Sequence, residues 1–370
     1  MELALSTMVV PEHVGDMREA VRQMDELGRR RVPFMFGVDY EMQSPLVIPL
    51  EQLEEYDIEL CIEGVPFGRT VAAESISNSR IDIKPNPITY DEYLVAFGSI
   101  RSQFVLGNSY LANLTFPTPI QANMTLRQIY AISHARYKLR YGEKFVVFSP
   151  ECFIRIEDGL ISSYPMKGTI DADTPNAKAT LLADEKENAE HITIVDLIRN
   201  DLGMVSDSVR VERLKRVEHI KTHRNHLLQM SSEITGQLRS GWEARIGSIL
   251  ESLLPAGSIT GAPKKKTIEI IREAELDDRG YYTGVFGVFD GTTLESGVMI
   301  RFVEQTHAGL VYRSGGGLTI YSVPELEYQE MKDKIYVPAY RDNTSREARV
   351  SESGVPLQAD AKLSASAVRS

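Results

Sequence analysis

The chain has few cysteines and no long apolar run. Only Cys61 and Cys152 occur among its 370 residues, which is too few for a disulfide scaffold and not the spacing of a metal site. This usage fits a reducing compartment, so we expect a cytoplasmic protein. Nowhere do about eighteen apolar residues follow one another, as a membrane-spanning helix requires. The N-terminus, "MELALSTMVVPEHVGDM", has no basic stretch ahead of a sustained apolar block, so the sequence predicts neither export nor a membrane partner.

The chain also has fewer basic than acidic residues. The chain carries 41 Lys and Arg against 52 Asp and Glu, a net charge of −11. This balance argues against a nucleic-acid backbone or an anionic membrane surface as the main partner. The content of 42% hydrophobic and 25% charged residues is that of an ordinary soluble globular protein.

Apolar periodicity predicts both helices and strands, in irregular order. Three- and four-residue steps predict helices over 13–30, 90–105, 175–200, 242–253 and 263–276. Apolar or alternating runs predict strands over 32–38, 109–116, 144–149, 153–157, 160–164, 281–289, 297–303 and 310–312. Because helices and strands do not alternate regularly, we expect an α+β fold with a large, mostly antiparallel sheet. The segment 341–370 has no aromatic residue and few large apolar ones, which predicts a disordered tail.

Two pairs of glutamates have the spacing of one helix face. Glu187 and Glu190 in "KENAEH", and Glu327 and Glu330 in "ELEYQEMKDK", each lie three residues apart. Hard divalent cations prefer oxygen ligands, and Mg²⁺ usually takes one or two carboxylates with waters and substrate oxygens. One glutamate from each helix could serve in this way. Either pair alone is more typical of an exposed helix face that answers nearby lysines.

Three consecutive glycines precede the second glutamate pair. Gly315 to Gly317 in "YRSGGGLTIYSVPE" follow a predicted strand, and their backbone N–H groups could approach an anion closely. A flexible hairpin is the alternative. Arg301, which interrupts the apolar run "GVMIRFVE", and Lys334 could each pair with a ligand carboxylate. An exposed strand arginine and a helical Glu-to-Lys pair are the alternatives.

Glu151 and Lys167 are connected by a predicted hairpin that turns at Asp158-Gly159. Lys167, in "YPMKGTI", falls in a bend just past the second strand, so both side chains could lie at the same end of the sheet. An amine and a carboxylic acid placed together could displace a hydroxyl, the amine attacking while the acid protonates the departing oxygen. A solvated turn lysine is the ordinary alternative.

Three histidines, His219, His223 and His226, have helical spacing. This spacing could suit a metal, but no cysteine or carboxylate completes the set, so a structural role is favoured.

Several motifs occur together in order, and through them the chain resembles the chorismate-utilising enzymes. These motifs are "NSYLANLTF", "SPECF", "PMKGT", "AEHITIVDLIRNDLG", "LPAGSITGAPK", "YYTGVFGVFDG", "VMIRF" and "SGGGLTIYSVPELEYQE". The family includes component I of anthranilate synthase and of aminodeoxychorismate synthase, and the isochorismate and salicylate synthases. The resemblance implies a β-sandwich core surrounded by helices, with a catalytic domain over 85–340 and a short N-terminal region over 1–84 packed on it.

The resemblance also implies roles for particular residues. Glu190 and Glu330 would bind Mg²⁺, and Glu187 and Glu327 would hold waters bound to the metal. The residues around chorismate would be Gly168, Thr169, Tyr282, Arg301, Gly315, Gly316, Gly317 and Lys334.

Position 167 separates the branches of the family. Anthranilate synthases are similar to "PIAGT" here, whereas aminodeoxychorismate synthases carry a lysine that is thought to add to C2 of chorismate as the C4 hydroxyl leaves. Ammonia is then thought to add at C4 and to displace the lysine from C2. The chain has Lys167 and keeps Glu151 as the matching general acid, so the resemblance implies amination of chorismate to 4-amino-4-deoxychorismate, in para-aminobenzoate and folate synthesis. Anthranilate synthase component I, isochorismate synthase and an inactive relative that binds chorismate or an amidotransferase are the alternatives.

Two departures from the family pattern bear on function. Gln229 stands where relatives often carry a histidine, and the tryptophan-binding motif of anthranilate synthases is not evident, so feedback by tryptophan is not expected. Neither cysteine lies in a Gly-Cys-Gly-like elbow, so we expect a separate glutamine amidotransferase subunit to supply ammonia.

Overall fold

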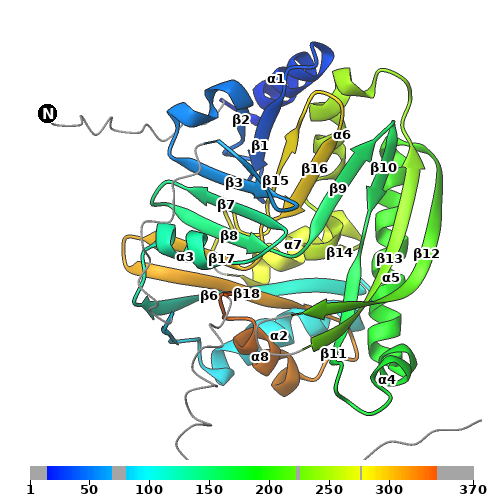
Figure 1. Cartoon of the computed structure of the whole chain (residues 1–370). Helices are drawn as coiled ribbons and strands as arrows, with labels where there is room; N and C mark the ends of the chain where they lie inside the picture. The colour runs from blue at the N-terminus through cyan, green and yellow to red at the C-terminus, as the bar shows by residue number, and fades with distance from the viewer. Residues whose placement is uncertain (1–14, 69–80, 222–225, 276, 340–370) are drawn as a thin grey trace, which may run out of the picture. The chain divides into compact units, whose positions relative to one another are not determined.

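Two antiparallel sheets form the centre of the structure (Figure 1). The computed structural model describes residues 15–68, 81–221, 226–275 and 277–339. Within these residues each sheet has nine strands, and the paired strands all run antiparallel. The predicted α+β class with a large, mostly antiparallel sheet core is confirmed.

The first sheet combines strands from three parts of the chain, within residues 34–49, 152–237 and 285–298. In the order of pairing they are β11 (Met166–Asp171), β13 (His226–Gln237), β10 (Leu160–Ser163), β9 (Cys152–Glu157), β16 (Leu294–Val298), β15 (Val285–Phe289), β1 (Phe34–Val38) and β2 (Leu46–Pro49), and β12 (Asp207–Lys221) pairs with β13. The order in the second sheet is β14 (Gly261–Ala262), β6 (Leu111–Ala122), β18 (Gly309–Leu318), β17 (Phe302–Thr306), β8 (Phe145–Ser149), β7 (Tyr137–Tyr141), β3 (Ile58–Ile62) and β4 (Val65–Phe67), and β5 (Ile83–Pro85) pairs with β6. Strands from the first 84 residues thus join both sheets.

Helices cover the outer faces of these sheets (Figure 1). The α-helices are α1 (Met17–Arg29), α2 (Tyr90–Val105), α3 (Leu126–Ile132), α4 (Ala177–Ala183), α5 (Glu185–Val205), α6 (Ile246–Leu253), α7 (Lys264–Ala274) and α8 (Pro324–Asp333). Short 3₁₀ turns are η1 (Leu50–Glu55), η2 (Trp242–Arg245) and η3 (Gly257–Ile259).

Strand β1 shows why apolar runs in this sequence are continuous. Phe34, Phe36 and Val38 pack into the cluster that also contains residues of α1, α5 and α6. Met35, which points to the opposite face, packs between the sheets with residues such as Leu60 of β3. A strand buried on both faces has no polar side to alternate with, so the run "FMFGV" has no polar position.

Several predicted elements differ in the structure. The helix expected over 242–253 begins as the 3₁₀ turn η2, and the strand expected over 281–289 begins only at Val285. The helix expected over 175–200 is two helices, because Asp184 lies in an extended conformation and its side chain accepts the Glu187 N–H at the start of α5. The strand expected over 297–303 is divided between β16 and β17, and Arg301 between them has a positive φ of 56°. His219 and His226 lie on strands β12 and β13, so their helical spacing was misleading. His223 lies outside the described residues, as does the segment expected to be a tail.

No helix within the described ranges is long and apolar enough to cross a membrane.

Candidate functional site

Lys167 lies within a strand and not in the bend that the sequence predicted. In β11 it pairs with Met230 of β13, while Thr169 pairs with Gln229, and the register shifts between them. Gly168 supplies the extra residue with a φ of 73°. A bulge of this kind redirects neighbouring side chains, and only glycine adopts this φ readily. A β-carbon at Gly168 would also lie 3.3 Å from Oε2 of Glu187 on helix α5, so the bulge brings the strand close to that helix.

Helix α5 presents its glutamates to this strand. Glu190 is buried, with 5% of its surface exposed, and its Oε2 lies 3.7 Å from Nζ of Lys167. The helix is fixed by its contacts with β11 and β13. The first glutamate pair is therefore not an exposed helix face.

The three glycines lie in strand β18 and form neither a loop nor a hairpin, which corrects the sequence interpretation. Gly315, Gly316 and Gly317 pair with residues 115, 114 and 113 of β6. A β-carbon at Gly317 would lie 2.9 Å from Nζ of Lys167. One at Gly316 would lie 3.7 Å from Nζ of Lys334 and 3.8–3.9 Å from carboxylate oxygens of α8. The missing side chains thus leave room between Lys167 and helix α8.

Helix α8 contributes the second glutamate pair and the lysine that follows it. Glu327 is buried, and Lys334 lies with its Nζ 2.7 Å from Oε1 of Glu330 and donates to the Gly315 carbonyl at 2.9 Å. The i, i+4 pair of the sequence interpretation is present, but burial lowers the pKa of Lys334, with Glu330 acting in the opposite direction.

Glu151, at the start of β9, lies close enough to three cationic groups to interact with them electrostatically. Burial raises the pKa of its carboxyl, while the hydroxyl of Ser258 and the charges of Lys167, Arg301 and Lys334 act to lower it. A carboxyl with a raised pKa retains its proton to higher pH, which suits a proton donor.

Arg301 and Tyr282 border the same region. The guanidinium of Arg301 lies 5.3 Å from the ring centre of Tyr336, and its buried Nε has no hydrogen-bond partner among the described residues. An orphaned guanidinium N–H is a donor that an anionic ligand could satisfy. Tyr282 is 4% exposed, and burial raises its pKa to about 12.

The carboxylates fit a hard cation only together with a ligand. Within the described ranges no group of three or more His, Cys, Asp and Glu side chains could hold a metal alone. Magnesium usually needs only one or two protein carboxylates, because water and substrate oxygens complete its shell. Glu190 reaches Lys167 beside Gly317, and Glu327 and Glu330 reach the neighbouring Gly316. Oxygen donors from two helices therefore converge on one short stretch of strand, and this donor set fits Mg²⁺.

Two contacts near the site, one partly buried and one buried, carry no sequence signal of their own. Ser258 of η3 donates to Oε1 of Glu151 at 2.5 Å, across a separation of 107 residues. The ring Nε2 of His191, next to Glu190, lies 2.6 Å from Oγ of Ser232, and burial lowers the His191 pKa to about 4. Ser258 falls in "GSITGAP", which entered the sequence interpretation only as part of a motif.

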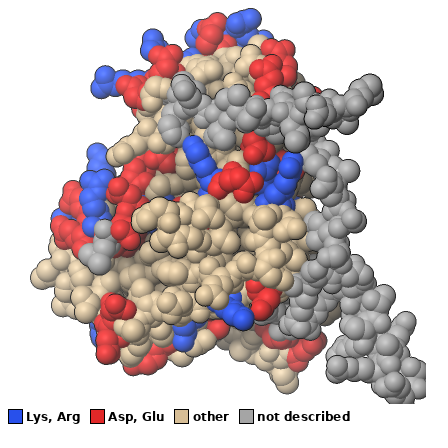
Figure 2. Space-filling view, turned by 90° about the vertical axis from the view of Figure 1, so that its left-hand side faces the viewer, with Lys and Arg blue, Asp and Glu red and all other residues tan. Residues whose placement is uncertain are grey.

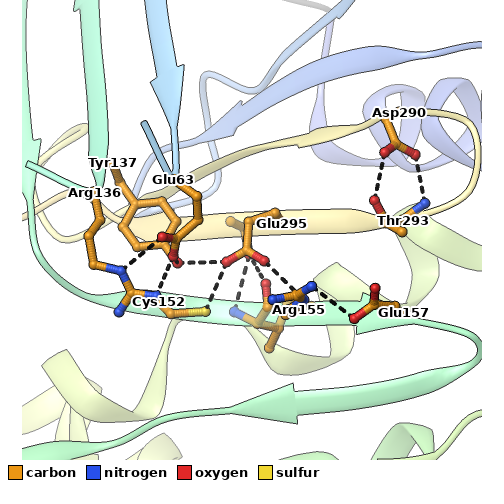
Figure 3. A network of polar contacts seen from close by, with 11 residues as sticks. Glu63, Arg136, Tyr137, Cys152, Arg155, Glu157, Asp290, Thr293 and Glu295 are labelled. Atoms are coloured by element: carbon orange, nitrogen blue, oxygen red, sulfur yellow. Dashed lines mark hydrogen bonds and ion pairs between the residues drawn. The ribbon is translucent and has the colours of Figure 1, made fainter. Parts of the chain in front are cut away.

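A polar network connects β9 to neighbouring strands (Figure 3). Tyr137 of β7 lies with its hydroxyl 2.7 Å from Oε1 of Glu63 and 2.6 Å from Oε1 of Glu295. The thiol of Cys152 donates to the same Glu295 oxygen at 3.5 Å. This network joins strands of both sheets at Cys152, the residue that follows Glu151 in the sequence.

Charges of both signs are intermixed on the face shown in Figure 2, around a broad uncharged area. This face is not the single-signed basic surface that a phosphate backbone attracts.

Comparisons with known proteins agree on one family. The model of the chorismate binding enzyme family matches residues 21–339. An uncharacterized PabA-like protein of Pasteurella multocida is 48% identical over 318 residues, covering 86% of this chain and 98% of that protein. Aminodeoxychorismate synthase component 1 of Bacillus subtilis is 33% identical over 265 residues, covering 68% of this chain and 55% of that protein. The chain belongs to the chorismate binding enzyme family.

A solved structure supports the fold. The isochorismate synthase DhbC of Bacillus anthracis, described as putative and specific for 2,3-dihydroxybenzoate, superposes with a TM-score of 0.64 at 18% identity, over 86% of this chain and 87% of that one. At this identity the likeness extends to the fold alone. Membership of the family nevertheless makes the chain an enzyme of the class that acts on chorismate.

Proposed function

We propose that the chain is the chorismate-aminating component of an aminodeoxychorismate synthase, which makes 4-amino-4-deoxychorismate from chorismate and ammonia. The single observation that carries the proposal is the position of Lys167. Its amine lies 3.7 Å from Glu190 and faces the room left by Gly317. The B. subtilis relative bears the same activity in its name.

The chemistry needs a nucleophile and an acid. After the ammonium of Lys167 has given a proton to water, its amine forms a bond to C2 of chorismate, the ring double bonds shift, and the C4 hydroxyl departs as water with a proton from Glu151. Ammonia then adds at C4 and the C2–nitrogen bond breaks, so the lysine amine is regenerated. The raised pKa of Glu151 and its electrostatic contact with Lys167 support this division of roles.

Substrate binding would use the remaining groups. Chorismate is a dicarboxylate, and Arg301 and Lys334 would each pair with a carboxylate, with Tyr282, Gly168, Thr169 and the three glycines of β18 around the ring. Glu190 and Glu330 would hold Mg²⁺, and Glu187 and Glu327 would accept hydrogen bonds from waters on it. Bound there, Mg²⁺ would supply positive charge that orients a substrate carboxylate.

The proposal extends to a partner and a compartment. A glutamine amidotransferase subunit would supply the ammonia, and the product would serve para-aminobenzoate and folate synthesis in the cytoplasm. The name of the P. multocida relative, PabA-like, points in the same direction.

Product analysis tests the proposal directly. The purified chain is incubated with chorismate, Mg²⁺ and ammonium, and the products are separated by chromatography and identified by mass spectrometry. We expect 4-amino-4-deoxychorismate, with none formed when ammonium is left out. Anthranilate with pyruvate would reassign the chain to anthranilate synthase component I, and isochorismate formed without ammonium would make it an isomerase. Chorismate binding without any turnover would indicate an inactive relative.

A further inference from the structure

We propose that Ser258 is a positioning residue that fixes which oxygen of Glu151 carries the acid proton. The inference rests on the proposed function, because it concerns the group assigned there as the acid. The hydroxyl of Ser258 donates to Oε1 of Glu151 at 2.5 Å. An oxygen that accepts this bond is the carbonyl oxygen of the acid, so the proton is left to Oε2.

The turn that carries Ser258 is held rigidly. Thr260 donates from its hydroxyl to the Ala256 carbonyl at 2.8 Å, and Arg279 donates to the Ile259 carbonyl at 2.9 Å. Gly257 has no room for a side chain, because a β-carbon there would lie 2.9 Å from atoms of Asp201 and Leu197. Helix α5 therefore packs directly against the turn, and the serine hydroxyl is fixed before substrate arrives.

The backbone of Glu151 is fixed as well. Its N–H donates to the hydroxyl of Ser149 at 3.1 Å, and its carbonyl accepts from Val298 at 3.1 Å. These bonds hold the main chain but leave the carboxyl free to rotate about its side-chain torsions. The bond from Ser258 to Oε1 restricts this rotation.

A cavity beside the pair explains why the restriction matters. Glu151 and Ser258 line it together with the apolar residues Ile198, Leu202 and Leu253. The groups that face Glu151 from other elements are Lys167 of β11, Arg301 before β17 and Lys334 after α8. Asp201, also in the cavity wall, is paired with Lys264 at 2.8 Å. A carboxyl released by Ser258 could turn into this cavity, away from the cations beside the substrate.

Two substitutions distinguish the effect of the Ser258 hydroxyl from that of the rest of the side chain. Ser258→Ala removes the bond, and Ser258→Thr keeps a hydroxyl. The matched control is Ser248→Ala, which removes a serine-to-carboxylate bond of 2.8 Å to Asp25 on α1, outside the site. We expect Ser258→Ala to lower kcat for amination about tenfold with an unchanged KM for chorismate, while the other two variants stay near wild type.

The pH profile distinguishes positioning from simple stabilisation. A hydrogen bond to the carboxylate favours its charged form, so its loss raises the pKa of Glu151. The alkaline limb of kcat against pH, where the acid loses its proton, should move to higher pH in Ser258→Ala. In Ser258→Thr it should lie at the same pH as in wild type. A Ser258→Ala profile that coincides with wild type would overturn the proposal, as would a Ser258→Thr variant that matches Ser258→Ala in both rate and limb.

A measurement without turnover keeps the two proposals separable. The titration of Glu151 is followed by NMR of protein carrying ¹³C-labelled glutamate, with Glu151→Gln to assign the signal. We expect its midpoint to rise in Ser258→Ala and not in Ser248→Ala. If the wild-type protein fails to aminate chorismate but the Glu151 midpoint still rises in Ser258→Ala, the proposed function is wrong and the effect of Ser258 on Glu151 stands. If wild type aminates and the shift and rate change are both missing, the positioning role is wrong.

Discussion

The amine of Lys167 and the carboxylate of Glu190 form an ion pair of 3.7 Å between strand β11 and helix α5. The pair depends on the bulge at Gly168, which shortens the approach of the strand to the helix. A residue assigned as a nucleophile and a residue assigned as a metal ligand therefore share one contact. Lysine at this position is held in place by the same helix that would hold the cation.

Replacing Lys167 by alanine removes the proposed nucleophile. We expect Lys167→Ala to lower the single-turnover rate of chorismate amination by on the order of a hundredfold or more, because both the covalent route and the positioned amine are lost. Lys178→Ala, which changes an exposed lysine on α4, is the control. Rapid-quench measurement with chorismate, Mg²⁺ and ammonium gives the rate. A single-turnover rate equal to that of wild type would defeat the covalent mechanism.

Gly317 offers a test of the room in front of that lysine. A β-carbon at this position would lie 2.9 Å from Nζ of Lys167, so Gly317→Ala should displace the amine and lower kcat roughly tenfold to a hundredfold. The protein should still fold, because the neighbouring atom is the end of a flexible side chain. Gly98→Ala on α2 is the control, since among the described residues no atom outside its own stretch of helix backbone lies within 4 Å of the added methyl. It should keep full activity and add about 0.5–1 kcal/mol of stability.

Circular dichroism and urea unfolding check that both glycine variants fold. A Gly317→Ala enzyme with unchanged kcat would show that Lys167 moves aside at no cost to the reaction.

Local signals in the sequence were sufficient for several elements. Helix α2 runs from Tyr90 to Val105, as the sequence predicted, because Thr89 and Glu92 form a reciprocal cap and the apolar period continues to Phe104. The hairpin between β9 and β10 turns at Asp158-Gly159, where both residues have positive φ. In each case the residues that determine the structure are neighbours in the sequence.

The site itself depends on contacts between distant segments. Glycines have low strand propensity, so nothing in "SGGG" indicates a strand until β6 pairs with it. Likewise Ser258 meets Glu151 only because η3 packs on α5. The sequence predicted the proximity of Glu151 and Lys167 from the hairpin that connects them. The contacts of Glu151 with Ser258 and of Lys167 with Glu190 join distant segments, so no local pattern indicates them.

The buried ion pair of Arg279 and Glu275, which contacts strand β6, should contribute strongly to stability. Arg279 and Glu275 form two hydrogen bonds, at 2.8 and 2.7 Å, and Arg279 is 1% exposed. Glu275→Ala leaves a buried guanidinium without its carboxylate, so we expect a loss of about 3–5 kcal/mol in the free energy of unfolding. Urea denaturation measures it.

The control for this pair lies on the preceding helix. Glu269→Ala breaks an exposed pair with Lys266 of 2.7 Å, and solvent screens such a pair, so stability should change little. Equal losses in the two variants would mean that burial adds nothing to the Arg279 pair.

The two contacts of the Tyr137 hydroxyl indicate that Glu295 carries a proton. It has one hydrogen but lies 2.7 Å from Glu63 and 2.6 Å from Glu295 (Figure 3), so one carboxyl must donate to it. Burial acts to raise the pKa of Glu63, but hydrogen bonds from Arg136 and Tyr137 lower it overall. Burial raises the pKa of Glu295, although the Tyr137 bond acts in the opposite direction. Glu295 is therefore the carboxyl that holds the proton.

A raised pKa in the folded state gives this carboxyl a definite effect on stability. Between its unfolded pKa, near 4.5, and its raised folded value, the folded protein binds more protons than the unfolded chain. The contribution of Glu295 is thus fully present below the unfolded pKa and is lost as pH rises through the folded one. Glu295→Gln cannot ionise, so its free energy of unfolding should decline less than that of wild type as the pH rises above 4.5. Urea unfolding at a series of pH values, with the exposed Glu157→Gln on β9 as control, measures the difference. Parallel curves for wild type and Glu295→Gln would place the shared proton elsewhere.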